Sequence, residues 1–155
     1  MSVEQYLISI KPVFVYRLFA GLKKFELRRV SCCVPSPGSI MVVYVSHPIQ
    51  VLIGEFIAED VRVGEPSVII DYVRGFRDSG VGEGDFEYIR GAEYAMAIRV
   101  SKPVLYRKFL GLRELERIIP GFKPPYSMRR IEEGEPLNML VLRKLREYTF
   151  ESFEN

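Results

Sequence analysis

The sequence predicts an α+β domain in which a curled, mixed and mostly antiparallel sheet carries helices at its mouth. Short apolar runs typical of strands outnumber the segments with helical spacing. These runs follow one another along the chain, and the helices do not alternate regularly with them. The 155 residues, 48% of them hydrophobic, suffice for a single domain with a substantial core.

The first part of the chain predicts a strand, a helix and a second strand. Residues 6–10 form a short apolar run typical of a buried strand. Pro12 suits the first turn of a helix, and apolar residues at helical spacing follow it until Gly21, which suits a helix end. From Lys24 to Arg28, charged and apolar residues alternate, as in a strand with one face against the core.

The middle of the chain predicts two further strands and two helices. The strands cover residues 40–45 and 51–63, and Gly54 marks a bulge or a close approach of the backbone. Ser67 is expected to cap a helix that runs to about residue 76. A glycine-rich loop and a short helix then occupy residues 79–90.

The last third predicts a long strand and more helix. Residues 92–100 are strand-like, and the strand extends toward residue 109. A helix is expected at 112–118, followed by an irregular, proline-stiffened loop at 120–127. Residues 137–148 are apolar enough on one side for a terminal helix or strand.

Composition points to a cytoplasmic protein. No segment reaches the roughly 18 apolar residues of a membrane helix, and the first residues lack the layout of a signal peptide. Cys32 and Cys33 are adjacent, which favours two reduced thiols over a bridge. Together with the one histidine, His47, they make no zinc set, so neither a metal nor a cofactor is expected.

Charge is unevenly distributed along the chain. The net charge is only +2, but residues 1–30 and 99–155 each carry +4 while residues 31–98 carry −6. If the two ends meet in space, one face of the molecule is positive, as nucleic-acid binding requires. Scarce Asn and Gln beside abundant Glu and Arg is also a thermophile trait.

The most informative pattern is Gly-x-Lys-x-x-Glu-x-Arg, formed by Gly21, Lys23, Glu26 and Arg28. Taken by itself, such a row of charges suits either a solvated strand face or a ligand cleft. The pattern resembles the signature of the ASCH family, within the PUA-like superfamily. Five flanking segments resemble that family in the same order: 8–12, 44–48, 53–56, 93–98 and 124–127.

The resemblance covers about residues 6–128. It implies an ASCH domain over residues 1–128 and a C-terminal extension, 129–155, packed on the same domain or trailing from it. The implied fold is a PUA-like pseudo-barrel with a cleft between the barrel and its first helix. The family is proposed to bind RNA, which makes RNA or a nucleotide the expected partner.

Carried onto this chain, the cleft residues of the signature are Lys23, Glu26 and Arg28. Lys11 joins them because it precedes a helix, where unpaired N–H groups favour anions. The matched segments place four further residues nearby: Ser46, Glu55, Tyr94 and Ser127.

These residue types suit a nucleotide. Arg28 can grip a phosphate with two parallel hydrogen bonds, and Lys23 adds a point charge. Glu26 can hold Arg28 in place or accept a hydrogen bond from a base. Tyr94 can stack on a base, although its apolar strand favours the core, and Glu55 suits a cleft acid as well as a solvated residue.

A hydrolase is the alternative. One branch of the family removes acyl groups from N4-acylated cytidine, and a metal-independent ribonuclease is a further enzymatic reading. The catalytic residues of an enzyme would then be Lys23, Glu26 and Glu55, and cleavage of RNA could use Lys23, Glu26 and Arg28. Glu26 stands where that branch has a threonine, and a carboxylate replaces a hydroxyl nucleophile poorly, which favours a binder over an enzyme.

The third reading concerns the C-terminal extension. Residues 129–155 can dock a protein partner, as in a regulatory or scaffold protein. Equally, their basic residues can lengthen a nucleic-acid track: Arg129, Arg130, Arg143, Lys144 and Arg146.

Overall fold

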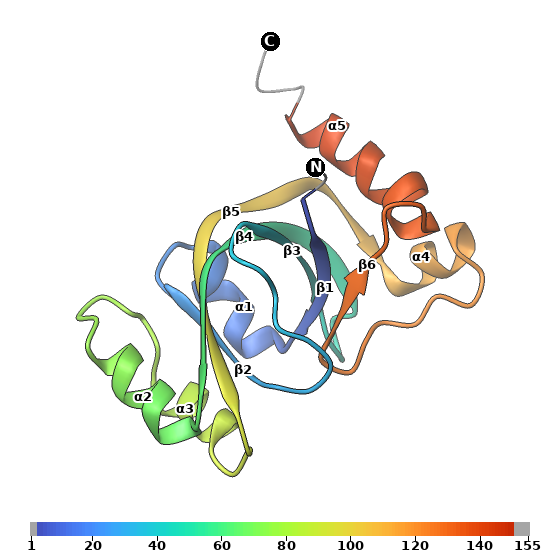
Figure 1. Ribbon diagram of the computed structural model, residues 1–155. Coiled ribbons are helices and arrows are strands. Elements are labelled where there is room, and N and C mark those ends of the chain that lie inside the picture. Colours follow the sequence, from blue (N-terminus) through green and yellow to red (C-terminus); the bar gives the residue numbers. More distant parts are fainter. Residues whose placement is uncertain (1–2, 151–155) are drawn as a thin grey trace.

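The computed structural model describes residues 3–150, within which six strands form one curled sheet (Figure 1). The strands lie in the order β2-β5-β4-β3-β1-β6. Their bounds are β1 Gln5–Ile10, β2 Phe25–Arg29, β3 Ser39–Val45, β4 Val51–Gly64, β5 Ala95–Gly111 and β6 Met128–Ile131. The helices are α1 Pro12–Phe19, α2 Pro66–Arg74, α3 Glu83–Ile89, α4 Leu112–Ile118, the π-helix η1 Leu137–Leu142 and α5 Arg143–Phe150.

The sheet is mixed, as predicted. Strand β1 pairs in parallel with β3, and the other four pairings are antiparallel. Register shifts in β4 near Gly54 and in the long β5 help the sheet to curl. A Cβ at Gly54 would lie 2.3 Å from the Val104 carbonyl oxygen, so this close approach of β5 requires glycine.

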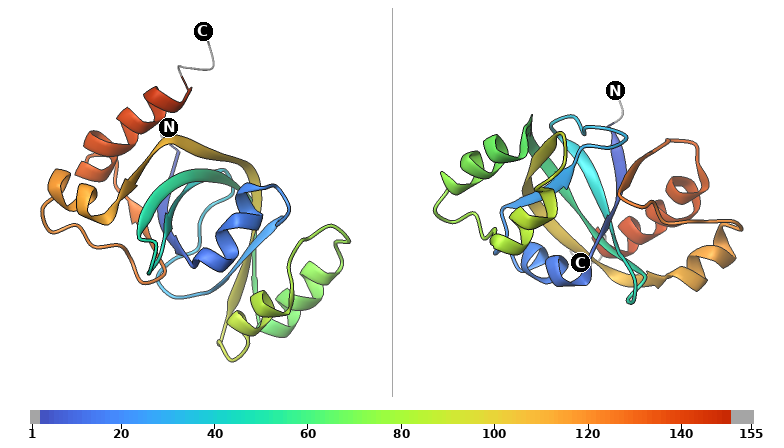
Figure 2. Two further views of the ribbon diagram at one scale, coloured as in Figure 1. Left: turned by 180° about the vertical axis from the view of Figure 1, so that it is seen from behind. Right: turned by 90° about the horizontal axis from the view of Figure 1, so that it is seen from below.

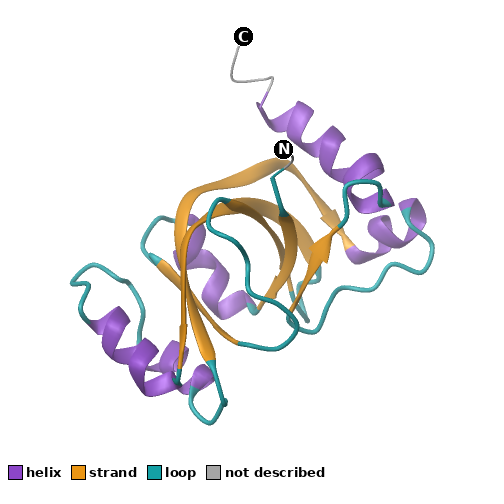
Figure 3. Cartoon of the chain, in the orientation of Figure 1, coloured by secondary structure: helices purple, strands orange, loops and turns teal. Residues whose placement is uncertain are grey.

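Three apolar clusters hold the helices against the sheet. Helix α1 lies at the open end of the curl, where Val15 and Leu18 pack with Ile10, Phe56 and other residues of the inner face (Figure 2). Helices α2 and α3 cover the outer face of β2 and β5. On the opposite side of the molecule, α4, η1 and α5 cover the outer face of β1, β3 and β4 (Figure 3). The predicted α+β class, with a curled sheet and a helix at its mouth, is confirmed.

Two local predictions differ from the structure. Helix α2 begins at Pro66 and has Glu65 at its N-cap position, because proline at the first helical position removes an N–H that would otherwise need a partner. Strand β6 was not predicted, since its four residues carry two arginines and no alternation long enough to recognise. Strand β6 pairs with β1, and its first residue, Met128, is also the residue at which the family resemblance ends.

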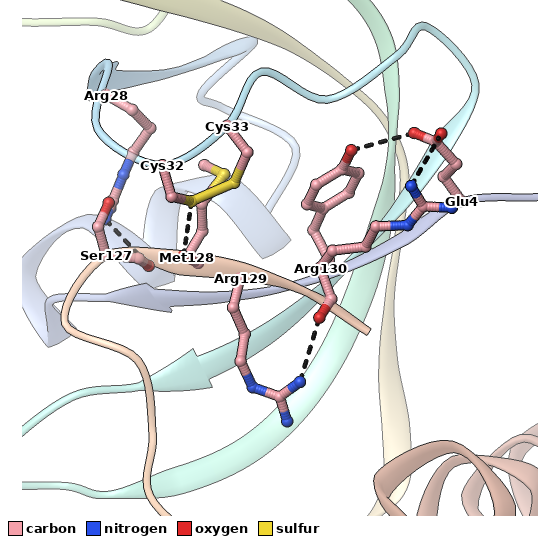
Figure 4. The surroundings of a disulfide bond; sticks show 9 residues. Glu4, Arg28, Cys32, Cys33, Ser127, Met128, Arg129 and Arg130 are labelled. Atoms are coloured by element: carbon pink, nitrogen blue, oxygen red, sulfur yellow. Dashed lines mark hydrogen bonds and ion pairs between the residues drawn. A yellow bond between two sulfur atoms is a disulfide. The ribbon is translucent and has the colours of Figure 1, made fainter. Parts of the chain in front are cut away.

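The prediction of reduced cysteines is wrong for this structure, which contains a disulfide between Cys32 and Cys33 (Figure 4). The chain bends directly after β2, so the two neighbouring side chains do not point in opposite directions as they would in a strand. Cys32 Sγ also lies 3.1 Å from the Met128 carbonyl oxygen, which places the pair beside the start of β6.

Within residues 3–150, no helix combines the length and the apolar character that crossing a membrane requires.

Candidate functional site

Strand β2 is buried on both faces over its first four residues, and this places Glu26 and Arg28 inside the molecule. Phe25 and Leu27 pack against α2 and α3. Glu26 and Arg28 point to the other face, into the curl of the sheet, and are only 2% and 4% exposed. Of the alternating charges, Lys24 is exposed, but Glu26 and Arg28 do not belong to a solvated strand face. The sequence pattern could not reveal the burial of these charges, because it gives no sign that the segment between β4 and β5, residues 65–94, covers the outer face of β2.

The buried charges form one connected group, here called the charge quartet: Lys23, Glu26, Arg28 and Asp85. Lys23 Nζ lies 3.0 Å from Glu26 Oε2 and 2.7 Å from Asp85 Oδ1. Glu26 Oε1 lies 3.4 Å from Arg28 Nη1. Two cations and two carboxylates thus neutralise each other beneath the surface, which is the condition under which buried charges are tolerated.

Lys23 stays charged in this setting. Burial pulls the pKa of Lys23 down, but the Glu26 and Asp85 carboxylates, which also accept hydrogen bonds from its amine, outweigh burial. The pKa is consequently raised above its ordinary value of 10.5. The amine is an internal counterion, and it also lies 4.8 Å from the centre of the Phe14 ring.

Asp85 reaches the quartet from α3, and sequence reasoning missed it. Its Oδ2 accepts a hydrogen bond from the Gly82 N–H at the start of the helix, which leaves Oδ1 for Lys23. The preceding loop packs tightly: Gly80 has φ +71°, and a Cβ there would lie 1.8 Å from the Leu22 carbonyl oxygen. The sequence shows the glycines of this loop but carries no signal that links residue 85 to residue 23.

Beside the quartet lies a cavity of about 330 Å³. Its charged and polar lining comes from several parts of the fold, and the loop 124–126 forms one edge. These residues are Ser9, Lys11, Glu26, Arg28, Tyr44, Ser46, His47, Gln50, Asp85 and Tyr88. The Tyr88 ring lies 5.5 Å from the Arg28 guanidinium and 5.9 Å from Lys11 Nζ. Tyr126 is fully exposed at the edge.

Arg28 is held by the loop on the far side of the cavity. Its Nη2 donates a hydrogen bond of 2.9 Å to Ser127 Oγ and one of 3.3 Å to the Ser127 carbonyl oxygen (Figure 4). Ser9 fixes the same loop, because its Oγ donates to the Pro125 carbonyl oxygen at 2.7 Å. The guanidinium is thereby oriented before any ligand arrives.

Two buried donors in this region lack a partner among residues 3–150: Arg28 Nε and Tyr44 Oη. Both residues line the cavity. Burial and, to a lesser extent, the Glu116 carboxylate raise the pKa of Tyr44, so its hydroxyl remains protonated and able to donate. An unsatisfied buried donor is unfavourable, and a ligand that accepts from it removes that cost.

The sequence-predicted site residues other than Glu55 fall into three groups. Lys11, Glu26, Arg28 and Ser46 line the cavity, and Ser127 binds Arg28. Lys23 lies behind Glu26 and Asp85 and is 3% exposed. Tyr94, by contrast, is half exposed and does not contribute to the cavity lining, because the chain turns there before β5 begins.

Glu55 lies away from the cavity, in a second polar network. Its Oε1 accepts hydrogen bonds from Tyr106 Oη at 2.8 Å and from Arg146 Nε at 2.7 Å. Arg146 in turn donates to Gln5 Oε1 at 2.6 Å. This network ties α5 to the outer face of the sheet. Because Glu55 follows Gly54, where the register shifts, its face could not be read from simple alternation.

The comparisons with known proteins concern the fold. No family model matches the chain, and no curated protein sequence matches it. The crystal structure of ASCH from Zymomonas mobilis is similar, with a TM-score of 0.73 and 24% identity over 89% of this chain and 94% of that one. Two single-residue variants of that protein give TM-scores of 0.69 and 0.70 at 24% and 23% identity. Each of these two alignments spans 83% of this chain, with 89% and 91% of the respective variant. The chain thus has the fold of ASCH proteins, as the resemblance of its sequence implies.

Proposed function

We propose that this protein binds RNA or a nucleotide by enclosing a base or nucleoside in the cavity beside the charge quartet. The observation that carries the proposal is the buried Arg28 Nε, a donor that lacks a partner among the described residues and belongs to a cavity-lining side chain. Evolved proteins seldom leave such a donor unpaired. A ligand oxygen or ring nitrogen is the group that would satisfy it.

The surroundings of that donor suit the edge of a base. Glu26 lines the same cavity, so an acceptor and a donor lie side by side. Base edges present complementary pairs of donors and acceptors, which carboxylates and arginines read. Tyr88 gives the cavity an aromatic side, and the fully exposed Tyr126 offers a stacking surface at its edge. Lys11 lies where the phosphate of a bound nucleotide could pair with a cation.

The hydrolase alternative has less support. It needs Lys23 to reach the ligand, but the amine is engaged by Glu26 and Asp85 and is nearly inaccessible. It also uses Glu55, which is bound to Tyr106 and Arg146 on the other face of the sheet. Binding without turnover therefore fits the positions of these side chains better.

Arg28→Lys is expected to weaken RNA binding by about 1.5–3 kcal/mol, which is roughly tenfold to more than a hundredfold. Lysine keeps the positive charge beside Glu26 but cannot reproduce the planar fork or the Nε donor. The affinity for short single-stranded RNA is measured by fluorescence anisotropy, beside a thermal melt of each variant.

The matched control is Arg99→Lys, because Arg99 is an exposed strand arginine whose partner is Glu59, away from the cavity. A folded Arg28→Lys protein with unchanged RNA affinity would contradict the proposal. Incubation of the wild-type protein with total RNA and a nucleoside panel gives a direct check. Ligand retained unchanged supports a binder, and released acyl groups or shortened RNA support an enzyme.

A further inference from the structure

The cavity has an unusual electrostatic composition for a site that meets a nucleotide. Two carboxylates, Glu26 and Asp85, line it beside Arg28, while Lys23 lies behind them. The other lining cation is Lys11, which precedes α1 and makes no ion pair with the quartet among residues 3–150. The remaining cation of the quartet, Arg28, is paired with Glu26 and bound to Ser127. A phosphate entering beside Arg28 would therefore meet two negative groups at short range, and like charges in a partly dry site repel strongly.

The charge of Asp85 determines the net charge of the quartet. Without its charge, the single carboxylate of Glu26 would be shared between Lys23 and Arg28, and the group would carry a net charge of +1. A buried excess of positive charge beside a cavity attracts a phosphate. With Asp85 present, the positive and negative charges of the quartet cancel.

We infer that Asp85 is a specificity-determining residue, which cancels the charge of Lys23 so that the cavity accepts an uncharged base or nucleoside and rejects a phosphate. This inference rests on the proposed function and narrows it, because it states which part of a nucleotide enters. The base is enclosed beside Arg28 and Tyr88, and the sugar-phosphate lies outward, on the side of Lys11. Asp85 belongs to the segment between β4 and β5, so that segment determines which class of ligand the site accepts.

The first experiment uses inorganic phosphate as the probe. Binding is followed by NMR, through the Nε–H signal of Arg28 in wild-type protein and in Asp85→Asn. Asparagine has nearly the same shape and can still accept the Gly82 N–H bond. We expect Asp85→Asn to bind phosphate at least roughly tenfold more tightly than the wild type. Equal phosphate affinity in the two proteins would overturn the inference.

Two further variants separate the effect of the charge of the quartet from the effect of the net charge of the whole protein. In Lys23→Met/Asp85→Asn the quartet is neutral again, and its phosphate affinity is expected to return to that of the wild type. In Glu87→Gln the net charge changes as in Asp85→Asn and on the same helix, but Glu87 is an exposed residue paired with Arg90. Its phosphate affinity is expected to stay unchanged. A gain in Glu87→Gln as large as in Asp85→Asn would also overturn the inference.

The second experiment compares nucleosides with their 5′-monophosphates. The wild type is expected to bind both within about threefold, because the phosphate lies outside the cavity, and Asp85→Asn is expected to favour the monophosphate by roughly tenfold. If Asp85→Asn does not fold, Lys23→Met supplies the test, since it leaves an excess negative charge. It should shift the preference toward the nucleoside by a similar factor, and no shift would overturn the inference.

The two experiments distinguish the inference from the function on which it rests. If the wild type binds neither nucleosides nor RNA while Asp85→Asn gains phosphate binding, the proposed function fails and the role of Asp85 in charge cancellation stands. If the wild type binds nucleosides but prefers the monophosphate as strongly as Asp85→Asn does, the proposed function stands and the role of Asp85 fails.

Discussion

Lys23→Met is expected to lower the free energy of unfolding by about 3–5 kcal/mol, the usual cost of removing one partner from a buried ion group. Methionine retains most of the apolar length of the lysine side chain, so the loss comes from charge. Glu26 would keep Arg28, but Asp85 would lose its cationic partner while remaining almost buried. The measurement is urea-induced unfolding at neutral pH, with a second series at alkaline pH.

The matched control is Lys24→Met, since Lys24 is the exposed neighbour on the same segment and its amine donates to the Gly21 carbonyl oxygen. Its expected change is within about 0.5 kcal/mol. Because the pKa of Lys23 is raised in the folded state, its stabilisation is fully present below pH 10.5 and is lost as the pH rises through the folded-state pKa. The difference between wild type and Lys23→Met should therefore narrow at strongly alkaline pH. Equal destabilisation by Lys23→Met and Lys24→Met would show that the quartet does not stabilise the fold.

The second large effect is expected at the network between Glu55 and Arg146. Arg146→Met should lower the free energy of unfolding by about 2–4 kcal/mol. It leaves the buried Glu55 carboxylate without its cationic partner, and it also removes the hydrogen bond to Gln5. The range lies somewhat below that for Lys23 because the Arg146 side chain is 21% exposed. Replacing the carboxylate as well, in Glu55→Leu/Arg146→Met, should recover part of the loss, since paired replacement by apolar groups is often tolerated.

Lys144→Met, on the exposed side of the same helix, is the control and should change stability by no more than about 0.5 kcal/mol. RNA affinity of the folded Arg146→Met protein should equal that of the wild type, because this network lies on the face of the sheet opposite the cavity. A double variant less stable than Arg146→Met would contradict the explanation that the unpaired Glu55 carboxylate causes the loss of stability. A loss of RNA affinity would instead favour the nucleic-acid track considered for the C-terminal extension.

Much of the fold could be predicted because its elements have strong local signals. Pro12 and Gly21 mark the ends of the first helical segment, and the apolar runs at β1, β3 and β4 are long enough to recognise as strands. Strand β6 could not be recognised, since its pairing with β1 depends on a partner more than a hundred residues away. The disulfide was also missed, because its formation depends on a bend that the sequence does not announce.

The site could be predicted only in part, and the reason is physical. The motif spacing placed Glu26 and Arg28 on one face of a strand, and the structure brings them to one cavity. The same spacing cannot show where Lys23 points, because this residue lies in the connection before β2. In the structure Lys23 does not line the cavity, and its amine pairs with Asp85. Side chains brought together by the docking of α3 belong to tertiary structure, and they leave no periodic trace in the sequence.

The contact between Arg28 and Ser127 joins residues that are 99 positions apart in the chain. Ser127 is positioned by β6, the last strand in the sequence, which must pair with the first strand to reach its place. Contacts of such long range form slowly, because the intervening chain has to be ordered before they are gained. The guanidinium is therefore oriented only when the sheet is complete. Until then, the free edge of the buried strand β1 remains open to pairing with other chains, so pairing with the short strand β6 protects it from aggregation during biosynthesis.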